Sequence, residues 1–194
     1  MQLTQRQSEL ADAGLRIVAR HGLAKVTFRA VAAESGWSLG AVQKAFPTKD
    51  DLLAAMMHRM RVTATVGSLA HPGRPSLHDW LTELLVSLQP VDEDRRNTML
   101  RALAFDQLAH HNRRVARAIA SSDRVLRDQI ASLVRRAQAE GEVPRALDAD
   151  AVARLFLSLA EGMASQLLYD PIPASEARGH ADYAVARLLA IPLD

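Results

Sequence analysis

Cysteine is absent from this 194-residue chain. Its absence excludes disulfide frameworks, thiol nucleophiles and zinc sites built from thiolates, and it fits a reducing compartment. Aromatic residues are also scarce, at 4%, so a pocket has few flat walls on which a planar cation could stack. No apolar run approaches the roughly 18 residues that span a membrane. Because residues 1–10 lack an apolar signal-peptide core, we expect a cytoplasmic protein.

Catalytic and metal-binding motifs are missing too. The sequence contains no glycine-rich phosphate loop, no HExxH and no GxSxG, and its acidic residues fall at expected helix caps and exposed faces. His110 and His111 are adjacent, so their side chains diverge on a helix, and neither has an Asp, Glu or His four residues later. We therefore expect no enzyme, no cofactor and no metal site.

Strand patterns are nearly absent, whereas apolar residues recur at helical spacing through most of the chain. We therefore predict an all-α protein. The nine predicted helices span residues 4–21, 27–34, 38–45, 48–66, 76–88, 92–109, 112–140, 148–169 and 174–190. The predicted caps are Thr27, Ser38, Thr48, Ser76 and Asp148 at N-termini, and Gly22 as a left-handed C-cap. The clearest loop is residues 71–75, which suggests a boundary between two parts.

Charge is distributed unevenly between these parts. Residues 1–61 carry nine Lys or Arg and five Asp or Glu, a net charge of +4, and the remainder carries 15 and 17, a net charge of −2. A basic N-terminal part is typical of a surface that faces an anion such as nucleic acid. An unevenly charged, solvated surface would give the same counts, so charge leaves both interpretations open.

Residues 27–46 favour the nucleic-acid interpretation, because two short helices joined by a tight turn at Gly36 are typical of a helix-turn-helix. On the second of these helices, Val42, Ala45 and Phe46 share one side and can pack on the helix before it. The opposite side carries Leu39, Gly40, Gln43 and Lys44. The alternative is an ordinary helical hairpin at the end of a bundle.

That opposite side has the chemistry needed in a major groove. Gly40 allows the backbone to approach DNA closely, and Gln43 can offer a bidentate amide of the kind that suits adenine. Lys44 can neutralise a phosphate. The N-cap Ser38, with the free N–H groups that follow it, can also bind phosphate. We therefore predict a helix that reads double-stranded DNA.

The stretch TFRAVAAESGWSLGAVQKAFPTKDDLL, residues 27–53, resembles the tetracycline-repressor (TetR) family of transcriptional regulators, as does the His21-Gly22 pair before it. Three later segments, residues 137–143, 160–163 and 167–171, are similar to the ligand-domain subgroup that includes the choline-responsive betaine repressor. The resemblance implies a helix-turn-helix domain over residues 1–48, linked by the helix at 48–66. It also implies a helical ligand-binding and dimerisation domain over residues 49–194.

The resemblance also implies roles for single residues. Thr27 and Lys49 would bind phosphates beside the groove, and Arg29 would reach a base or a phosphate. The implied recognition face consists of Ser38, Leu39, Gly40, Gln43 and Lys44. Members of the family often have Tyr where this chain has Gln43, and an aromatic residue or His in place of Ala45. The preferred operator therefore cannot be transferred from a relative.

The sequence supports a dimer independently of the resemblance. Small or polar residues at helical spacing on the helix at 148–169 would let a second helix approach closely. With the last helix, it could build a four-helix bundle across a two-fold axis. The predicted interface residues are Ser158, Gly162, Ser165, Tyr169, Ala181, Val185 and Leu188. The alternative is a helix in the core of its own chain.

A dimer would place two recognition helices about 34–36 Å apart on a palindromic operator. A small-molecule effector that binds two forms of the dimer unequally would release the DNA. The candidate pocket residues are Trp80, Met99, Leu103, Phe105, Phe156 and Met163, and the alternative for each is ordinary core. Two other functions compete with this one. The first is an all-helical enzyme, which turnover of a ligand by the purified protein without DNA binding would favour. The second is a helical scaffold that binds only protein, to which the absence of any DNA affinity at low salt would point.

Overall fold

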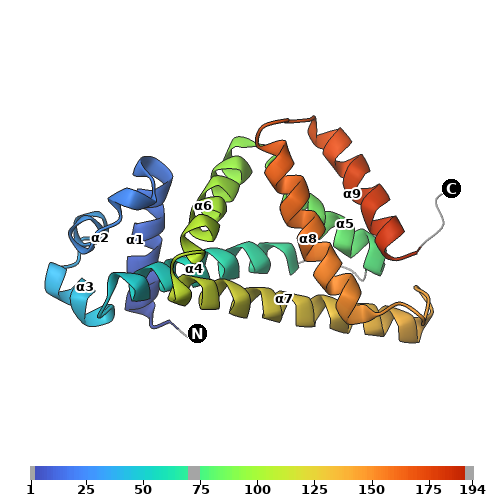
Figure 1. Cartoon of the computed structure of the whole chain (residues 1–194), viewed down its shortest axis with the longest axis horizontal. Coiled ribbons are helices and arrows are strands. Elements are labelled where there is room, and N and C mark those ends of the chain that lie inside the picture. Colours follow the sequence, from blue (N-terminus) through green and yellow to red (C-terminus); the bar gives the residue numbers. More distant parts are fainter. Residues whose placement is uncertain (1–2, 70–74, 191–194) are drawn as a thin grey trace. The chain divides into compact units, whose positions relative to one another are not determined.

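The computed structural model describes residues 3–69 and 75–190, which form nine α-helices and one 3-10 helix and contain no strand (Figure 1). The all-α prediction is confirmed. Residues 71–74 of the predicted loop lie outside the described ranges. The elements are α1 (Gln5–His21), η1 (Leu23–Lys25), α2 (Phe28–Ser35), α3 (Leu39–Ala45), α4 (Lys49–Leu69), α5 (Leu77–Ser87), α6 (Glu93–Ala109), α7 (Arg113–Glu140), α8 (Ala149–Leu167) and α9 (Ala174–Leu188). None of these helices is both long enough and apolar enough to cross a membrane.

Side-chain caps fix where the helices begin. All five predicted N-caps accept a hydrogen bond from a backbone N–H of the first turn. The prediction for Gly22 is wrong in part. Its φ of 79° is positive, but its ψ of 165° is extended and not left-handed helical, and this conformation leads into η1. The element η1 was not predicted, because three residues are too few to show a period.

The described chain divides into two compact units. The first contains α1 to α3, α4 up to residue 67, and residues 100–122 of α6 and α7, and the second contains the rest. The start of α4 belongs to the first unit because Leu52, Ala55 and Met56 are fully buried in its core. That core also contains Phe105 and Val115. The division therefore differs from the expected boundary after residue 48.

Helices α1 and α4 meet closely at Gly14. A Cβ atom added at Gly14 would lie 2.5 Å from the sulfur of Met56, and Met56 is fully buried. An ion pair between Arg59 and Asp12, with Nε 3.0 Å from Oδ1, joins the same two helices. The approach of α1 to α4 therefore depends on the missing side chain.

Replacing Gly14 with Val should destabilise the protein by about 1–3 kcal/mol, because the added methyl groups overpack the core against Met56. Thermal or urea unfolding measures this loss. The double variant Gly14→Val/Met56→Ala is the control. Its loss in free energy of unfolding should be smaller than the sum of the losses in the two single variants, because truncating Met56 leaves space for the side chain added at position 14. Strictly additive losses would show that Met56 is not the obstacle.

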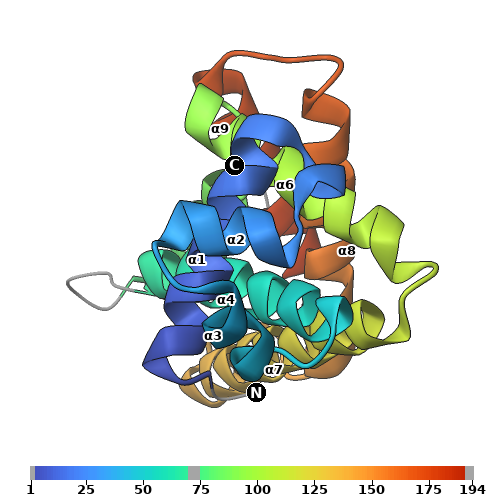
Figure 2. The same ribbon diagram turned by 90° about the vertical axis from the view of Figure 1, so that its left-hand side faces the viewer.

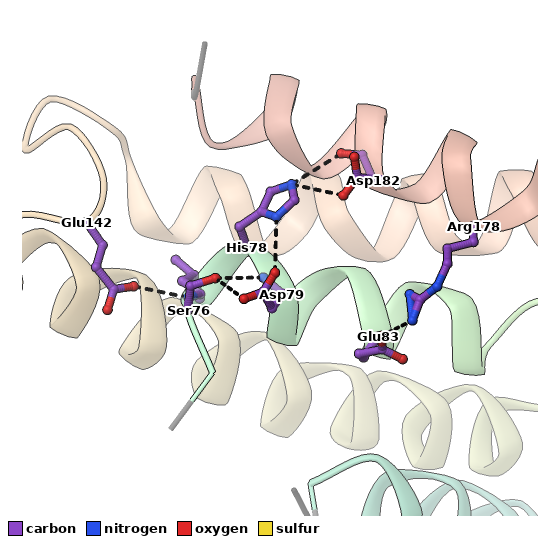
Figure 3. Close-up of polar contacts among 8 residues, drawn as sticks. Ser76, His78, Asp79, Glu83, Glu142, Arg178 and Asp182 are labelled. Atoms are coloured by element: carbon purple, nitrogen blue, oxygen red, sulfur yellow. Dashed lines mark hydrogen bonds and ion pairs between the residues drawn. The ribbon is translucent and has the colours of Figure 1, made fainter. Parts of the chain in front are cut away.

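In the second unit, α5 and α9 lie against each other and are joined at their polar edges (Figure 3). His78 Nε2 lies 3.6 Å from Oδ1 of Asp182, and Arg178 pairs with Glu83. Glu142 accepts a hydrogen bond of 3.1 Å from the N–H of Leu77, the first residue of α5. The first two contacts join α9 to α5, and the third joins the start of α5 to the segment that follows α7.

Candidate nucleic-acid interface

The turn between α2 and α3 depends on Gly36. Its φ of 76° and ψ of 3° are left-handed helical, and glycine adopts this conformation without steric cost. The hydroxyl of Ser35 accepts a hydrogen bond of 3.3 Å from the N–H of Trp37, and Ser38 then caps α3 through Ala41. Figure 2 shows α2 and α3 with the tight turn between them. The chain therefore forms the predicted helix-turn-helix geometry.

One face of α3 is anchored in the core and the other is open. Val42 and Phe46 are buried, with 0% and 2% of their surface exposed, while Gly40, Gln43 and Lys44 are exposed. Burying a Val and a Phe contributes about 1.5–3 kcal/mol each, which holds this seven-residue helix in place. The open face is therefore presented on a rigid support.

The other predicted contact residues differ in exposure. Thr27, Arg29, Ser38 and Lys49 are exposed, as a direct contact with DNA requires. Leu39 differs, because it is half-buried and packs against the core of the first unit. Its side chain therefore belongs largely to the support of α3.

Three sets of contacts within the first unit position α2, α3 and the start of α4. The side-chain amide of Gln7 donates to the carbonyl of Ala45, at 3.1 Å, and so holds α1 on the end of α3. At the start of α4, the amide of Asn112 donates to Asp50, at 2.7 Å, and Arg114 pairs with Asp51. The third set joins α1 to α2 through Glu34.

Glu34 accepts a hydrogen bond from Nε of Arg16, at 2.7 Å, and a weaker one from Arg20, at 3.3 Å. The hydrogen bond from Arg16 and the positive charges nearby hold the pKa of the Glu34 carboxyl below its usual value. Glu34 therefore remains ionised, and it neutralises two arginines that would otherwise add to the positive charge near α2.

A stacked pair near α3 was not predicted from the sequence. The guanidinium carbon of Arg6 lies 4.6 Å from the centre of the Trp37 ring, which is cation–π geometry. Residues 6 and 37 are far apart in the chain, so no local pattern could have joined them.

Two family models match this chain. Residues 10–56 match the model described as bacterial regulatory proteins of the tetR family, and residues 77–190 match that of the BetI-type transcriptional repressor, C-terminal. The chain belongs to the TetR family. This confirms the resemblance noted for residues 27–53 and for the C-terminal part. The protein is accordingly a DNA-binding transcriptional regulator with a BetI-type C-terminal domain.

One curated relative and two solved structures are also similar to this chain. The regulator PksA of Bacillus subtilis (strain 168) is 26% identical over 177 residues, which cover 90% of this chain and 84% of PksA. A transcriptional regulator from Rhodococcus sp. Rha1 has the same fold, with a TM-score of 0.80 and 22% identity over 96% of this chain and 97% of that one. A regulator from Saccharomonospora viridis, solved with choline, has a TM-score of 0.75 and 22% identity over 92% and 94% of the two chains.

The six candidate pocket residues do not gather in one unit of this TetR-family fold. Phe105 is fully buried in the core of the first unit, in one cluster with residues of α1 and α4, which favours the alternative of ordinary core for this residue. Leu103 belongs to the first unit as well. The other four, which lie in the second unit, are Trp80, Met99, Phe156 and Met163.

The predicted dimer residues fall into two groups. On α8, Ser158 and Gly162 are exposed and Ser165 is half-buried, and Tyr169, two residues after the end of α8, is exposed. A surface that contacts a second chain requires such exposure. On α9, the prediction is wrong for Ala181 and Val185, because both are fully buried in the core of the second unit.

In contrast to Ala181 and Val185, two large side chains on the same two helices are exposed. Leu155 on α8 is 58% exposed and Tyr183 on α9 is 56% exposed. Leu188 is half-buried and packs against the core.

Within residues 3–69 and 75–190, no three His, Asp or Glu side chains lie close enough together to hold a metal ion.

Proposed function

We propose that this TetR-family regulator is a homodimeric repressor that reads a palindromic operator through α3 and leaves it when a small-molecule effector binds. The observation that carries the proposal is the division of α3 into a buried face and an open one. Val42 anchors the helix, and Gly40, Gln43 and Lys44 stay exposed. A helix that enters a major groove needs this division, because its outer side chains must be free to reach base edges.

Each exposed residue has a distinct proposed role. Gln43 presents its amide to an adenine, and Lys44 neutralises a phosphate. Ser38 already accepts the N–H of Ala41, at 3.2 Å, but its hydroxyl proton remains available to a phosphate. Thr27 caps α2 in the same way, so its hydroxyl can donate a hydrogen bond to a phosphate of the DNA backbone on the other side of the groove. Arg29 and Lys49 add charge to these phosphate contacts.

We expect a dimer because one short recognition helix contacts too few base pairs to select an operator. A second copy, held by the exposed surface of α8 and α9, would place another α3 one DNA turn away. The family assignment supports this arrangement, and so does the exposure of Leu155 on α8 and of Tyr169 two residues after its end. In a dimer, this apolar surface would be removed from water.

The effector is proposed to bind in the second unit. Choline, found in the related Saccharomonospora viridis structure, is the first compound to test. The contacts of Asn112 and Arg114 with the start of α4 support a mechanical role for the α6–α7 turn. A shift of this turn would move α4, which begins four residues after α3 ends. An effector acts in this way only if it binds the two arrangements with different affinity.

Replacing Gln43 with Ala should weaken binding to the operator by about 10-fold and leave binding to a scrambled duplex nearly unchanged, because a bidentate base contact is worth roughly 1–3 kcal/mol of discrimination. Gel shifts with DNA flanking the protein's own gene, over a series of salt concentrations, measure both affinities. The matched control is Gln129→Ala on α7, which removes another exposed amide and should change neither. Equal losses on the two DNAs would exclude Gln43 as a base reader.

A further inference from the structure

A groove of about 660 Å³ separates the start of α1 from α3. Two of its lining residues, Arg6 and Lys44, are cations that come from different helices. Lys44 also belongs to the proposed DNA face. The groove therefore borders directly on the surface that α3 offers to DNA.

The cations of this groove are available to a ligand. Glu9, which also lines it, accepts a hydrogen bond of 3.1 Å from the amide of Gln5. Arg6 and Lys44 have no carboxylate partner among the described residues. An anion that enters the groove would therefore not compete with an existing ion pair.

Arg6 is also oriented before any ligand arrives. Its guanidinium lies over Trp37 at 4.6 Å from the ring centre, and stacking leaves the N–H groups at the guanidinium edge free. The hydrogen bond from Gln7 to the carbonyl of Ala45 holds this part of α1 on α3. A guanidinium fixed in this way loses little side-chain entropy when it binds an oxyanion at two points.

We infer that Arg6, held on Trp37, forms with Lys44 a phosphate-binding site at the edge of α3, and that a backbone phosphate of the bound DNA occupies it. The inference rests on the proposed contact of α3 with DNA. It adds a contact from α1 that lies outside the helix-turn-helix. Trp37 is a positioning residue in this site, because it acts through Arg6.

Replacing Arg6 with Ala should weaken binding to a scrambled duplex and to the operator by the same factor, about 3- to 10-fold, because a phosphate contact carries no sequence information. The slope of log affinity against log salt concentration should become less steep by about 0.9 for each protomer that loses its phosphate contact. Fluorescence anisotropy with labelled duplexes over a salt series measures both quantities. Arg136→Ala, which removes an exposed arginine of α7 in the second unit, is the charge-matched control and should leave both unchanged.

Two further variants separate the charge from the stack. Arg6→Lys should keep the salt slope but lose about 2- to 5-fold in affinity, because the ammonium lacks the planar face that stacks. Trp37→Leu should weaken binding by a similar factor, and adding it to Arg6→Ala should cause no further loss. Circular dichroism checks that each variant is folded.

The outcomes distinguish this site from the proposed function. An Arg6→Ala variant with wild-type affinity and slope on both duplexes would overturn the inference while α3 binding stands. A loss confined to the operator, with the slope unchanged, would also overturn it, because Arg6 would then read a base. A wild-type protein without affinity for any duplex at low salt would instead refute the proposed function.

Discussion

Replacing Gly40 with Leu should reduce affinity for the operator by at least about 100-fold and leave the free protein as stable as before or more stable. Specific binding typically exceeds non-specific binding by a factor of 10³–10⁷, so a loss of this size is within range. A Cβ atom added at Gly40 meets nothing within 4 Å in its own chain. A helical glycine costs roughly 0.8–1.0 kcal/mol relative to alanine. No contact of Gly40 among the described residues offsets that cost, whereas close approach of a DNA backbone would.

The measurement pairs operator binding with thermal unfolding. Gly40→Ala should raise the melting temperature and reduce affinity less than Gly40→Leu does, because the loss should grow with the size of the added side chain. Ala139→Leu, at an exposed position of α7, controls for an added surface leucine and should affect neither quantity. A Gly40→Leu variant that binds its operator normally would show that α3 does not approach DNA through this position.

Local signals account for the success of the helix predictions. Every predicted helix lies within three residues of an observed one at both ends. Caps such as Thr27 and Ser38 act on the N–H groups of the next turn, so a few neighbouring residues decide where a helix begins. The exposed face of α3 was predictable for the same reason, because the buried Val42 and Phe46 are four residues apart and share one face, while Gln43 points away from it.

The errors have a different physical origin. Periodicity shows that α9 has an apolar stripe but not what covers it. In this fold Ala181 and Val185 of that stripe are buried in the core of the second unit. Phe105 is apolar on α6, yet only the tertiary structure assigns it to the core of the first unit. The stack of Arg6 on Trp37 depends on how α1 meets the turn before α3. Each of these contacts joins segments that are distant in sequence, and such contacts leave no local pattern.

Replacing Gly162 with Arg should convert the proposed dimer to a monomer, raising the dimer dissociation constant by at least about 100-fold, which corresponds to about 2.7 kcal/mol. Gly162 is exposed on α8, and a Cβ atom added there also meets nothing within 4 Å. The single chain therefore has room for the new side chain. Across a two-fold axis the substitution occurs twice, and like charges brought together in an interface cost several kcal/mol.

Sedimentation equilibrium measures the dissociation constant, and Ala139→Arg on α7 supplies the same charge at another exposed position. The Gly162→Arg variant should also lose operator affinity, because each monomer reads only one half-site. The Gly40→Leu variant, in contrast, should lose operator affinity and remain a dimer. The two variants thus separate groove contact from assembly. A Gly162→Arg protein that remains a dimer would place the interface on another surface, and a monomer with undiminished operator affinity would show that two half-sites are not read together.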